Sequence, residues 1–80
     1  MTTINDKNWI SVESSNIARI KYNRSSRELL VEFKGGAQYL YQNVPQDTFL
    51  FVITADSVGS TFNTLVKSQP IDHPYERLAA

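Results

Sequence analysis

The sequence predicts an α+β domain in which an antiparallel β-meander of three to four strands is followed by two α-helices packed on one face. The first half of its 80 residues alternates apolar and polar side chains with the period of half-buried strands, whereas the second half spaces its apolar residues as an amphipathic helix does. Because the strands precede the helices and do not alternate with them, an antiparallel sheet is expected.

Four segments of the first half have the composition of β-strands: residues 9–13, 17–22, 28–33 and 37–43. The alternation is clearest in the third segment, where Leu29, Val31 and Phe33 are separated by polar residues. Polar or glycine-containing breaks separate the four segments: residues 14–16, 23–26 and 35–36.

The first hairpin is predicted to turn at residues 23–26. A turn centred between residues 24 and 25 places Ile20 opposite Leu29 on the buried face and Lys21 opposite Glu28 on the other face. Apolar residues then meet apolar residues and opposite charges meet, so this register agrees with both patterns.

The second hairpin has two alternatives, which place Tyr39 and Tyr41 on opposite faces. A two-residue Gly-Gly loop leaves both tyrosines on the open face of the sheet. A three-residue loop over residues 34–36, with Gly36 in the left-handed conformation, pairs Val31 with Tyr39 and lines the core with both rings. We favour the second alternative because it places the bulkier side chains under the helices.

After residue 44 the spacing of the apolar residues becomes helical. Pro45 suits the first turn of a helix, where its missing N–H needs no partner, and Phe49, Val52 and Ile53 then form the buried face. Residues 55–57 are expected to end this helix.

A second helix is expected to start at Ser57, whose hydroxyl would accept a hydrogen bond from a free backbone N–H. Phe62, Leu65 and Val66 form its apolar face, and Pro70 is expected to end it.

We expect a single domain over residues 9–80, with a flexible N-terminus at residues 1–8 and an irregular tail from about residue 69. The N-terminal residues are polar and lack the features of a signal peptide, and the longest apolar run, residues 49–53, is too short to cross a bilayer. The protein is therefore expected to be cytoplasmic, with no membrane partner.

The composition argues against catalysis. Eight Lys plus Arg balance eight Asp plus Glu, so no overall charge attracts nucleic acid. The chain has no Cys and only one His, which leaves little with which to build a thiolate metal site or a nucleophilic triad. We therefore expect no enzyme, no metal and no cofactor.

A longer pattern resembles the KTSC domain family. It consists of V-x-S-S-x-I-x-x-I-x-Y at residues 12–22, L-x-V-x-F-x-x-G-x-x-Y-x-Y-x-x-V-P at residues 29–45 and A-x-S-x-G-x-x-F-N at residues 55–63. The family is named after the C-terminal region of some lysyl-tRNA synthetases and also occurs as small free-standing proteins of bacteria and phages. The resemblance covers residues 12–68 and implies an association with RNA.

A nucleic-acid interface is the first functional hypothesis. Residues 19–34 contain five Lys or Arg against two Glu, a local net charge of +3. Phosphates could follow this strand edge while aromatic rings stack on bases. The candidate residues are four cations and the two tyrosines of the family's Y-x-Y signature: Arg19, Lys21, Arg24, Arg27, Tyr39 and Tyr41. The alternative is a solvated face on which the strand cations pair with the carboxylates opposite them.

A second candidate site is the start of the second helix, where Ser57, Gly59 and Ser60 could hold an anion such as phosphate on free N–H groups. The alternative is an ordinary helix cap.

The third hypothesis concerns Leu50 and Phe51, which project away from the buried face of the first helix. They could contact a protein partner, as in a phage or prophage inhibitor module, or a second copy in a homodimer. The alternative is that the tail covers them, through Tyr75 or Leu78. An oligomer that sequesters nucleotides is a further function that the sequence leaves open.

Overall fold

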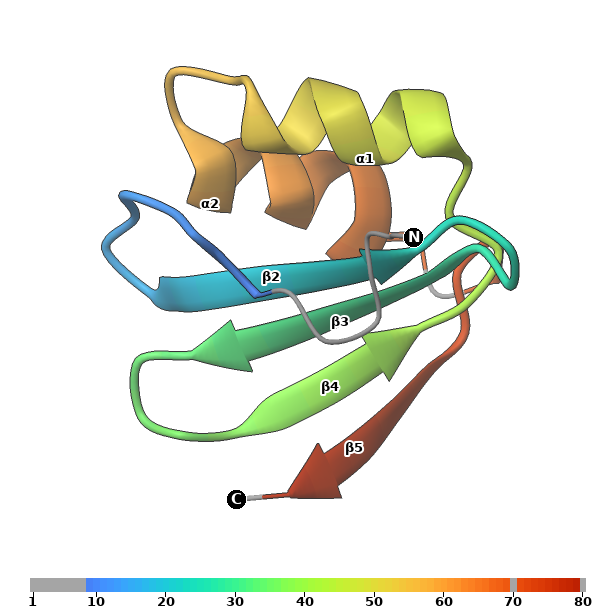
Figure 1. Cartoon of the computed structure of the whole chain (residues 1–80), viewed down its shortest axis with the longest axis horizontal. Coiled ribbons are helices and arrows are strands. Elements are labelled where there is room, and N and C mark those ends of the chain that lie inside the picture. The colour runs from blue at the N-terminus through green and yellow to red at the C-terminus, as the bar shows by residue number, and fades with distance from the viewer. Residues whose placement is uncertain (1–8, 70, 80) are drawn as a thin grey trace.

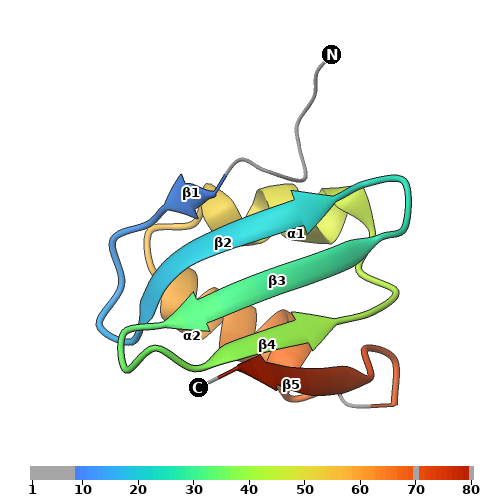
Figure 2. The ribbon, with the colours of Figure 1, turned by 60° about the horizontal axis from the view of Figure 1, so that its bottom comes forward.

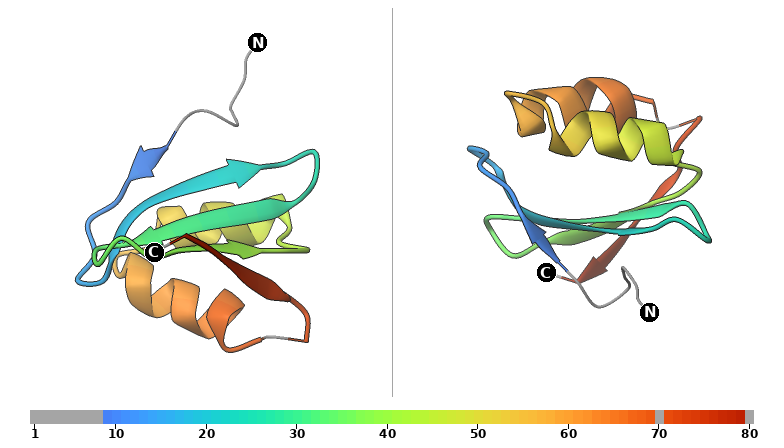
Figure 3. Two further views of the ribbon diagram at one scale, coloured as in Figure 1. Left: turned by 90° about the horizontal axis from the view of Figure 1, so that it is seen from below. Right: turned by 45° about the horizontal axis from the view of Figure 1, so that its top comes forward.

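The computed structural model describes residues 9–69 and 71–79, so the expectation of a flexible N-terminus at residues 1–8 lies outside the described residues. It contains one antiparallel sheet of five strands in the order β1-β2-β3-β4-β5, with the helices on one face only (Figure 1, Figure 3). The strands are β1 (Ile10–Ser11), β2 (Ile17–Asn23), β3 (Glu28–Phe33), β4 (Gln38–Tyr41) and β5 (Tyr75–Ala79). The helices are α1 (Gln46–Ile53) and α2 (Val58–Phe62), which continues into the π-helical turn η1 (Asn63–Lys67). The predicted α+β class is confirmed, with one strand more than the upper expectation.

The core lies between the sheet and the helices, and its buried apolar side chains all fall between Ile17 and Val66. Tyr22 shows how the two layers are joined. Its ring stacks on Phe49 of α1 with a centroid separation of 4.3 Å, and its hydroxyl donates a 2.5 Å hydrogen bond to the carbonyl of Val44. Burying each large apolar side chain stabilises the fold by roughly 1.5–3 kcal/mol.

The first hairpin has the predicted faces but not the predicted pairs. Ile20 lies opposite Val31, and Lys21 lies opposite Leu30, which shifts the register by two residues. The turn is longer than expected because it extends to Arg27, whose backbone is left-handed at φ 59°. Side chains alternate with a period of two, so this shift exchanges pairing partners but keeps Ile20 and Lys21 on their expected faces. A β-bulge between Ile17 and Arg19 places the Ile17 side chain in the core, although strict alternation would place it on the face of Arg19 and Lys21.

The second hairpin follows the three-residue alternative. Val31 lies opposite Tyr39, Leu29 lies opposite Tyr41, and Gly36 has a φ of +103°. This confirms that both tyrosines belong to the helix-covered face. It also places Gln38 and Leu40 on the helix-free face, since neighbouring residues of a strand point in opposite directions.

The prediction of an irregular tail is wrong for its last residues, because Tyr75–Ala79 form the edge strand β5 beside β4 (Figure 2). The connection to β5 is held by Gln42, whose N–H donates to the carbonyl of Pro74 at 2.9 Å and whose carbonyl oxygen lies 3.2 Å from His73 Nδ1. The two prolines of the tail do not prevent this pairing, because β5 begins only after the second of them and so needs no N–H from a proline.

The starts of both helices differ in detail from the expectations. Pro45 is the N-cap residue of α1, and its carbonyl accepts a hydrogen bond from the N–H of Phe49. Ser57 is the N-cap residue of α2, but its side chain makes no capping hydrogen bond, so the predicted hydroxyl cap is wrong. The backbone carbonyl of Ser57 instead accepts from the N–H of Thr61 at 3.0 Å.

The first turn of α2 packs closely against the loop between β1 and β2. A Cβ atom on Gly59 would lie 2.6 Å from Asn16 Oδ1 and 2.8 Å from Ser14 Oγ, both of which are closer than real Cβ contacts. These two atoms are held in place, because the Ser14 hydroxyl donates to Asn16 Oδ1 and accepts from the N–H of Ile17. The glycine is therefore required by the approach of the helix to this loop.

We predict that Gly59→Ala lowers the free energy of unfolding by about 1–3 kcal/mol, the usual result of overpacking. Gly35→Ala is the matched control, because nothing lies within 4 Å of a Cβ at that position and its backbone is not left-handed. Urea unfolding of both variants measures the difference. Equal stabilities would show that the loop gives way and that the close approach does not require glycine.

Candidate functional site

Three tyrosines from two neighbouring strands form a cluster on the helix-covered face. Tyr39 and Tyr41 come from β4, and Tyr75 lies opposite Tyr41 on β5. The ring centroids are 6.4 Å apart for Tyr39 and Tyr41, 5.9 Å for Tyr39 and Tyr75, and 5.7 Å for Tyr41 and Tyr75. Phe33 of β3 extends the cluster, with its ring edge-on to Tyr39 at 5.8 Å. The result is one continuous aromatic surface.

A groove of about 490 Å³ lies over this cluster. Its walls combine the aromatic rings with one amide and one ammonium group. The lining residues are Asn16, Phe33, Ala37, Tyr39, Tyr41, Lys67 and Tyr75. The three tyrosines differ in exposure, because Tyr41 is 2% exposed and forms the floor, whereas Tyr75 is 56% exposed and forms the rim. Tyr39 is partly buried between them.

One cation, Lys67, lines the groove, a second, Arg77, lies beside it near the Tyr39 ring, and none of the described lining residues carries a carboxylate. Lys67 ends the π-helical turn, in which the N–H of Ser68 donates to the carbonyl of Asn63 at 2.9 Å, and its Nζ lies 5.7 Å from the centroid of Phe33. Arg77 lies opposite Tyr39 on β5, with its Cζ 5.9 Å from that ring's centroid. The groove can therefore offer stacking surfaces and positive charge to one ligand.

Burial changes the chemistry of the groove's floor. Desolvation raises the pKa of the Tyr41 phenol to about 12, and the neighbouring phenols of Tyr39 and Tyr75 add to the rise. Tyr41 is therefore a neutral hydrogen-bonding group at any physiological pH.

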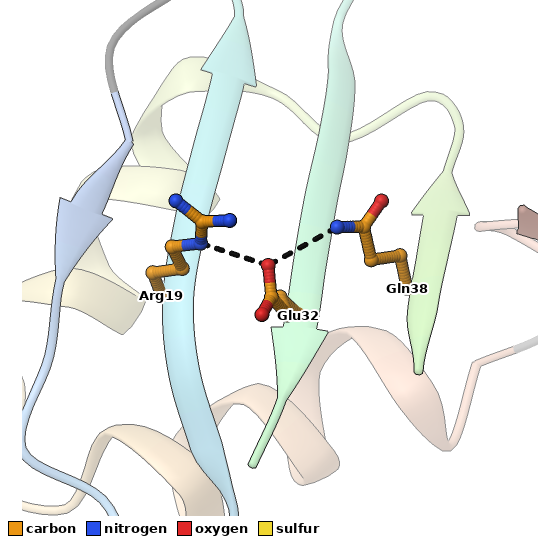
Figure 4. A network of polar contacts seen from close by, with 3 residues as sticks. All are labelled: Arg19, Glu32 and Gln38. Atoms are coloured by element: carbon orange, nitrogen blue, oxygen red, sulfur yellow. Dashed lines mark hydrogen bonds and ion pairs between the residues drawn. The ribbon is translucent and has the colours of Figure 1, made fainter. Parts of the chain in front are cut away.

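The predicted basic strand edge lies on the other face of the sheet. Arg19 Nε lies 2.8 Å from Glu32 Oε1, and Gln38 Nε2 donates to the same oxygen at 3.1 Å (Figure 4). The hydrogen bond from Arg19 is the main reason why the pKa of the Glu32 carboxyl lies below its usual range. This pairing resembles the solvated-face alternative, although Lys21 does not pair with Glu28.

Trp9 covers the remaining part of that edge. The Cζ of Arg19 lies 4.2 Å from its ring centroid, and the Nζ of Lys21 lies 4.8 Å from it. Arg24 and Arg27 lie in the exposed turn between β2 and β3. The six predicted nucleic-acid residues are thus divided among the helix-free face, a turn and the helix-covered face, and they do not form one site.

Sequence reasoning missed two lining residues of the groove, Lys67 and Tyr75, and the adjacent Arg77. The last two belong to a strand that the prolines of the tail concealed. Residues 75–78 do not alternate strictly between apolar and polar side chains, so no period-two signal marked this strand in the sequence. Lys67 had no comparable signal, because a π-helical turn changes which residues share a helix face.

The predicted anion site faces a second, polar groove of about 580 Å³. Ser57, Gly59 and Ser60 line it, but so do Glu13 and Asp56, and no Lys or Arg is among its described lining residues. Two carboxylates without a cation oppose the binding of an anion.

Leu50 and Phe51 are 43% and 64% exposed on α1, as expected of residues that project away from the core. The alternative in which the tail covers them is wrong, because the tail pairs with β4 at the sheet edge and both residues remain exposed. In the part of the chain that the structure describes, no helix has the length and apolar character needed to cross a membrane.

The fold and the groove define a small α+β domain with an aromatic, cationic groove between a sheet edge and a helix. The chain belongs to the KTSC domain family, whose sequence model matches residues 13–69. This confirms the resemblance found in the sequence. β5 lies beyond the matched residues, so the groove combines residues inside and outside the family match.

Relatives of similar size extend this assignment. The chain is 35% identical over 60 residues to an uncharacterized protein of Stutzerimonas stutzeri, an alignment that covers 75% of this chain and 84% of the relative. It is 41% identical over 56 residues to a protein of Tsukamurella paurometabola, with 70% and 84% covered. A crystal structure of a KTSC domain protein from Yersinia pestis superposes with a TM-score of 0.79 at 26% identity, covering 90% of this chain and 97% of that one.

The raised pKa of Tyr41 predicts a loss of stability at high pH. Between pH 10 and 12 the unfolded chain releases the phenolic proton while the folded protein retains it, so unfolding becomes more favourable as pH rises. We expect this residue to contribute a loss of roughly 1.4 kcal/mol per pH unit. Urea unfolding of the wild type and of Tyr41→Phe through this range isolates the effect. Parallel pH dependences for the two proteins would contradict it.

Proposed function

We propose that this protein is a non-enzymatic, cytoplasmic binding module that holds an unpaired base of single-stranded RNA in the tyrosine groove. The observation that carries the proposal is the combination of four aromatic rings and two cations around one groove of about 490 Å³. Unpaired bases stacked on aromatic side chains are the usual means by which proteins recognise single-stranded RNA.

The exposed tyrosines supply the stacking surface. Tyr75 is more than half exposed, and Tyr39 lies beside it with a tilt of 48° between the rings. The ring of Tyr41 packs edge-on against Phe62 of α2 at 5.1 Å, which fixes it to the core. Tyr41 in turn supports the other two tyrosine rings. A base that stacks on Tyr75 or Tyr39 therefore meets a surface fixed by the core.

The charges select the ligand class. An aromatic cluster alone would also suit a cationic ligand. The positive charges of Lys67 and Arg77 repel a cationic ligand, and no carboxylate among the described lining residues offsets this repulsion. A ligand that joins a flat ring to a negative group, as a nucleotide does, satisfies both parts of the groove.

The helix-free strand edge is the weaker location for RNA. Arg19 is already engaged by Glu32 and Trp9, and Lys21 also lies over Trp9. A phosphate at this edge would have to compete with these contacts.

We predict that Tyr75→Ala weakens the binding of oligoadenylate by about 1–3 kcal/mol, roughly 5- to 150-fold, because one stacking surface is lost. Tyr75→Phe keeps the ring and is the matched control, so it should bind as the wild type does. Isothermal titration calorimetry at low salt measures both. Equal binding by Tyr75→Ala, together with weak binding by Arg19→Ala/Lys21→Ala, would move the RNA site to the strand edge.

A second candidate function is protein interaction through α1. The exposure of Leu50 and Phe51, with the covering tail removed as an explanation, favours it. A second copy of this chain is the simplest partner, because a symmetric contact would bury four such side chains at once.

We predict weak self-association that Leu50→Glu/Phe51→Lys abolishes. Burying each side chain stabilises by about 1.5–3 kcal/mol, which offsets part of the association entropy. Analytical ultracentrifugation of wild type and variant over a concentration series tests this. A wild type that stays monomeric at the highest concentration would assign the two residues to another partner or to none.

A further inference from the structure

We infer that the groove recognises one isolated unpaired nucleotide with at most two phosphate contacts, such as a bulged nucleotide or a strand end, and not an extended single-stranded tract. This inference rests on the proposed function and specifies its ligand. Three properties of the groove support it: the arrangement of the rings, the number of cations and the volume.

The rings provide a place for one base only. Tyr41 is 2% exposed, so it offers no face to a ligand. The two rings that remain, Tyr39 and Tyr75, have centroids 5.9 Å apart and are tilted by 48°. A base that stacks on one of them meets the other at an angle. Successive stacked bases of a strand would need separate platforms, whereas Tyr39 and Tyr75 form two surfaces inclined to each other around a single ring.

The cations limit the phosphates. Lys67 belongs to the helix side of the groove and Arg77 to the strand side, so two phosphates could flank the base. The other described cations lie elsewhere: Arg19 and Lys21 on the helix-free face, Arg24 and Arg27 in the β2–β3 turn, and Lys34 in the β3–β4 turn. Among the described residues, these cations form no continuous row with Lys67 and Arg77 along which a longer strand could run.

The volume of the groove agrees with the binding of a single nucleotide. A groove of about 490 Å³ lies within the range of sites that enclose one small organic molecule, about 300–1,000 Å³. Proteins that bind single strands without regard to length instead use grooves that follow the backbone over about 4–16 nucleotides.

Two phosphate contacts predict a shallow salt dependence. For single-stranded nucleic acid, the slope of log affinity against log salt is about −0.7 for each phosphate contacted, which gives about −1.4 here. Lys67→Ala and Arg77→Ala should each reduce the magnitude of the slope by about 0.7. Arg24→Ala removes the same charge outside the groove and should leave the slope unchanged.

The test uses the full chain and four probes: adenosine 3′,5′-bisphosphate, oligoadenylates of increasing length, an RNA duplex with one bulged adenosine and the same duplex fully paired. We expect the bulged duplex to bind and the paired duplex not to bind. Affinity for oligoadenylate should rise with length only by the statistical gain from more equivalent sites. The salt series is measured with the oligoadenylates, to which the single-strand coefficient applies.

The outcomes separate this inference from the function on which it rests. Absence of binding to every probe at low salt overturns the proposed function and the inference together. Oligoadenylate affinity that rises steeply with length, with a slope much steeper than about −1.4, overturns the single-nucleotide inference but leaves RNA binding intact. If adenosine 3′,5′-bisphosphate binds and none of the RNA probes does, the ligand is a free nucleotide and the proposed RNA ligand is overturned.

Discussion

The register of the β3–β4 hairpin is the constraint on which the rest of the molecule depends. Gly36 adopts a φ of +103°, which allows a turn of three residues where a Gly-Gly pair could also have closed a turn of two. One residue fewer would move Tyr39 and Tyr41 to the helix-free face, because side chains alternate along a strand. The core would then lose the ring of Tyr41, which packs against Phe62, and the groove would lose its floor. A single backbone conformation thus fixes both the packing and the candidate site.

The groove is completed by elements that the core does not require. The buried apolar residues all lie between Ile17 and Val66, whereas Lys67 follows them and Tyr75 and Arg77 belong to an edge strand whose described side chains are all exposed. Lys67 and Arg77 are exposed and Tyr75 is 56% exposed, so hydrophobic packing alone does not account for their positions. An edge strand that brings an aromatic ring and a cation to the same face as Tyr39 instead makes physical sense as the wall of a binding site.

The sequence could predict the fold class and the faces of β3 and β4, because both depend on the periodicity of apolar residues. It could not predict the pairs in the first hairpin, since Ile20 opposite Leu29 and Ile20 opposite Val31 both join apolar residues and only the length of the turn distinguishes them. β5 was missed because two prolines precede it, its residues do not alternate strictly between apolar and polar, and its hydrogen-bonding partner, β4, is distant in the chain. For the candidate site, the two tyrosines of β4 could be placed on the correct face, but their partners Lys67, Tyr75 and Arg77 come from η1 and β5, whose geometry no local pattern specified.

The distribution of charge is compatible with the proposed anionic ligand, although the chain as a whole is neutral. On the helix-free face, the carboxylate of Glu32 holds Arg19, and the ring of Trp9 covers both Arg19 and Lys21. Glu32 balances the charge of Arg19, whereas Lys21 lies over the neutral ring of Trp9. On the groove side, Lys67 and Arg77 lie over aromatic rings and have no carboxylate among the described groove residues. An aromatic face attracts a cation more weakly than a carboxylate does when both are exposed to water, so these two cations remain available to a phosphate. The groove is locally positive because the described carboxylates lie elsewhere, so the proposed binding does not require an excess of Lys and Arg.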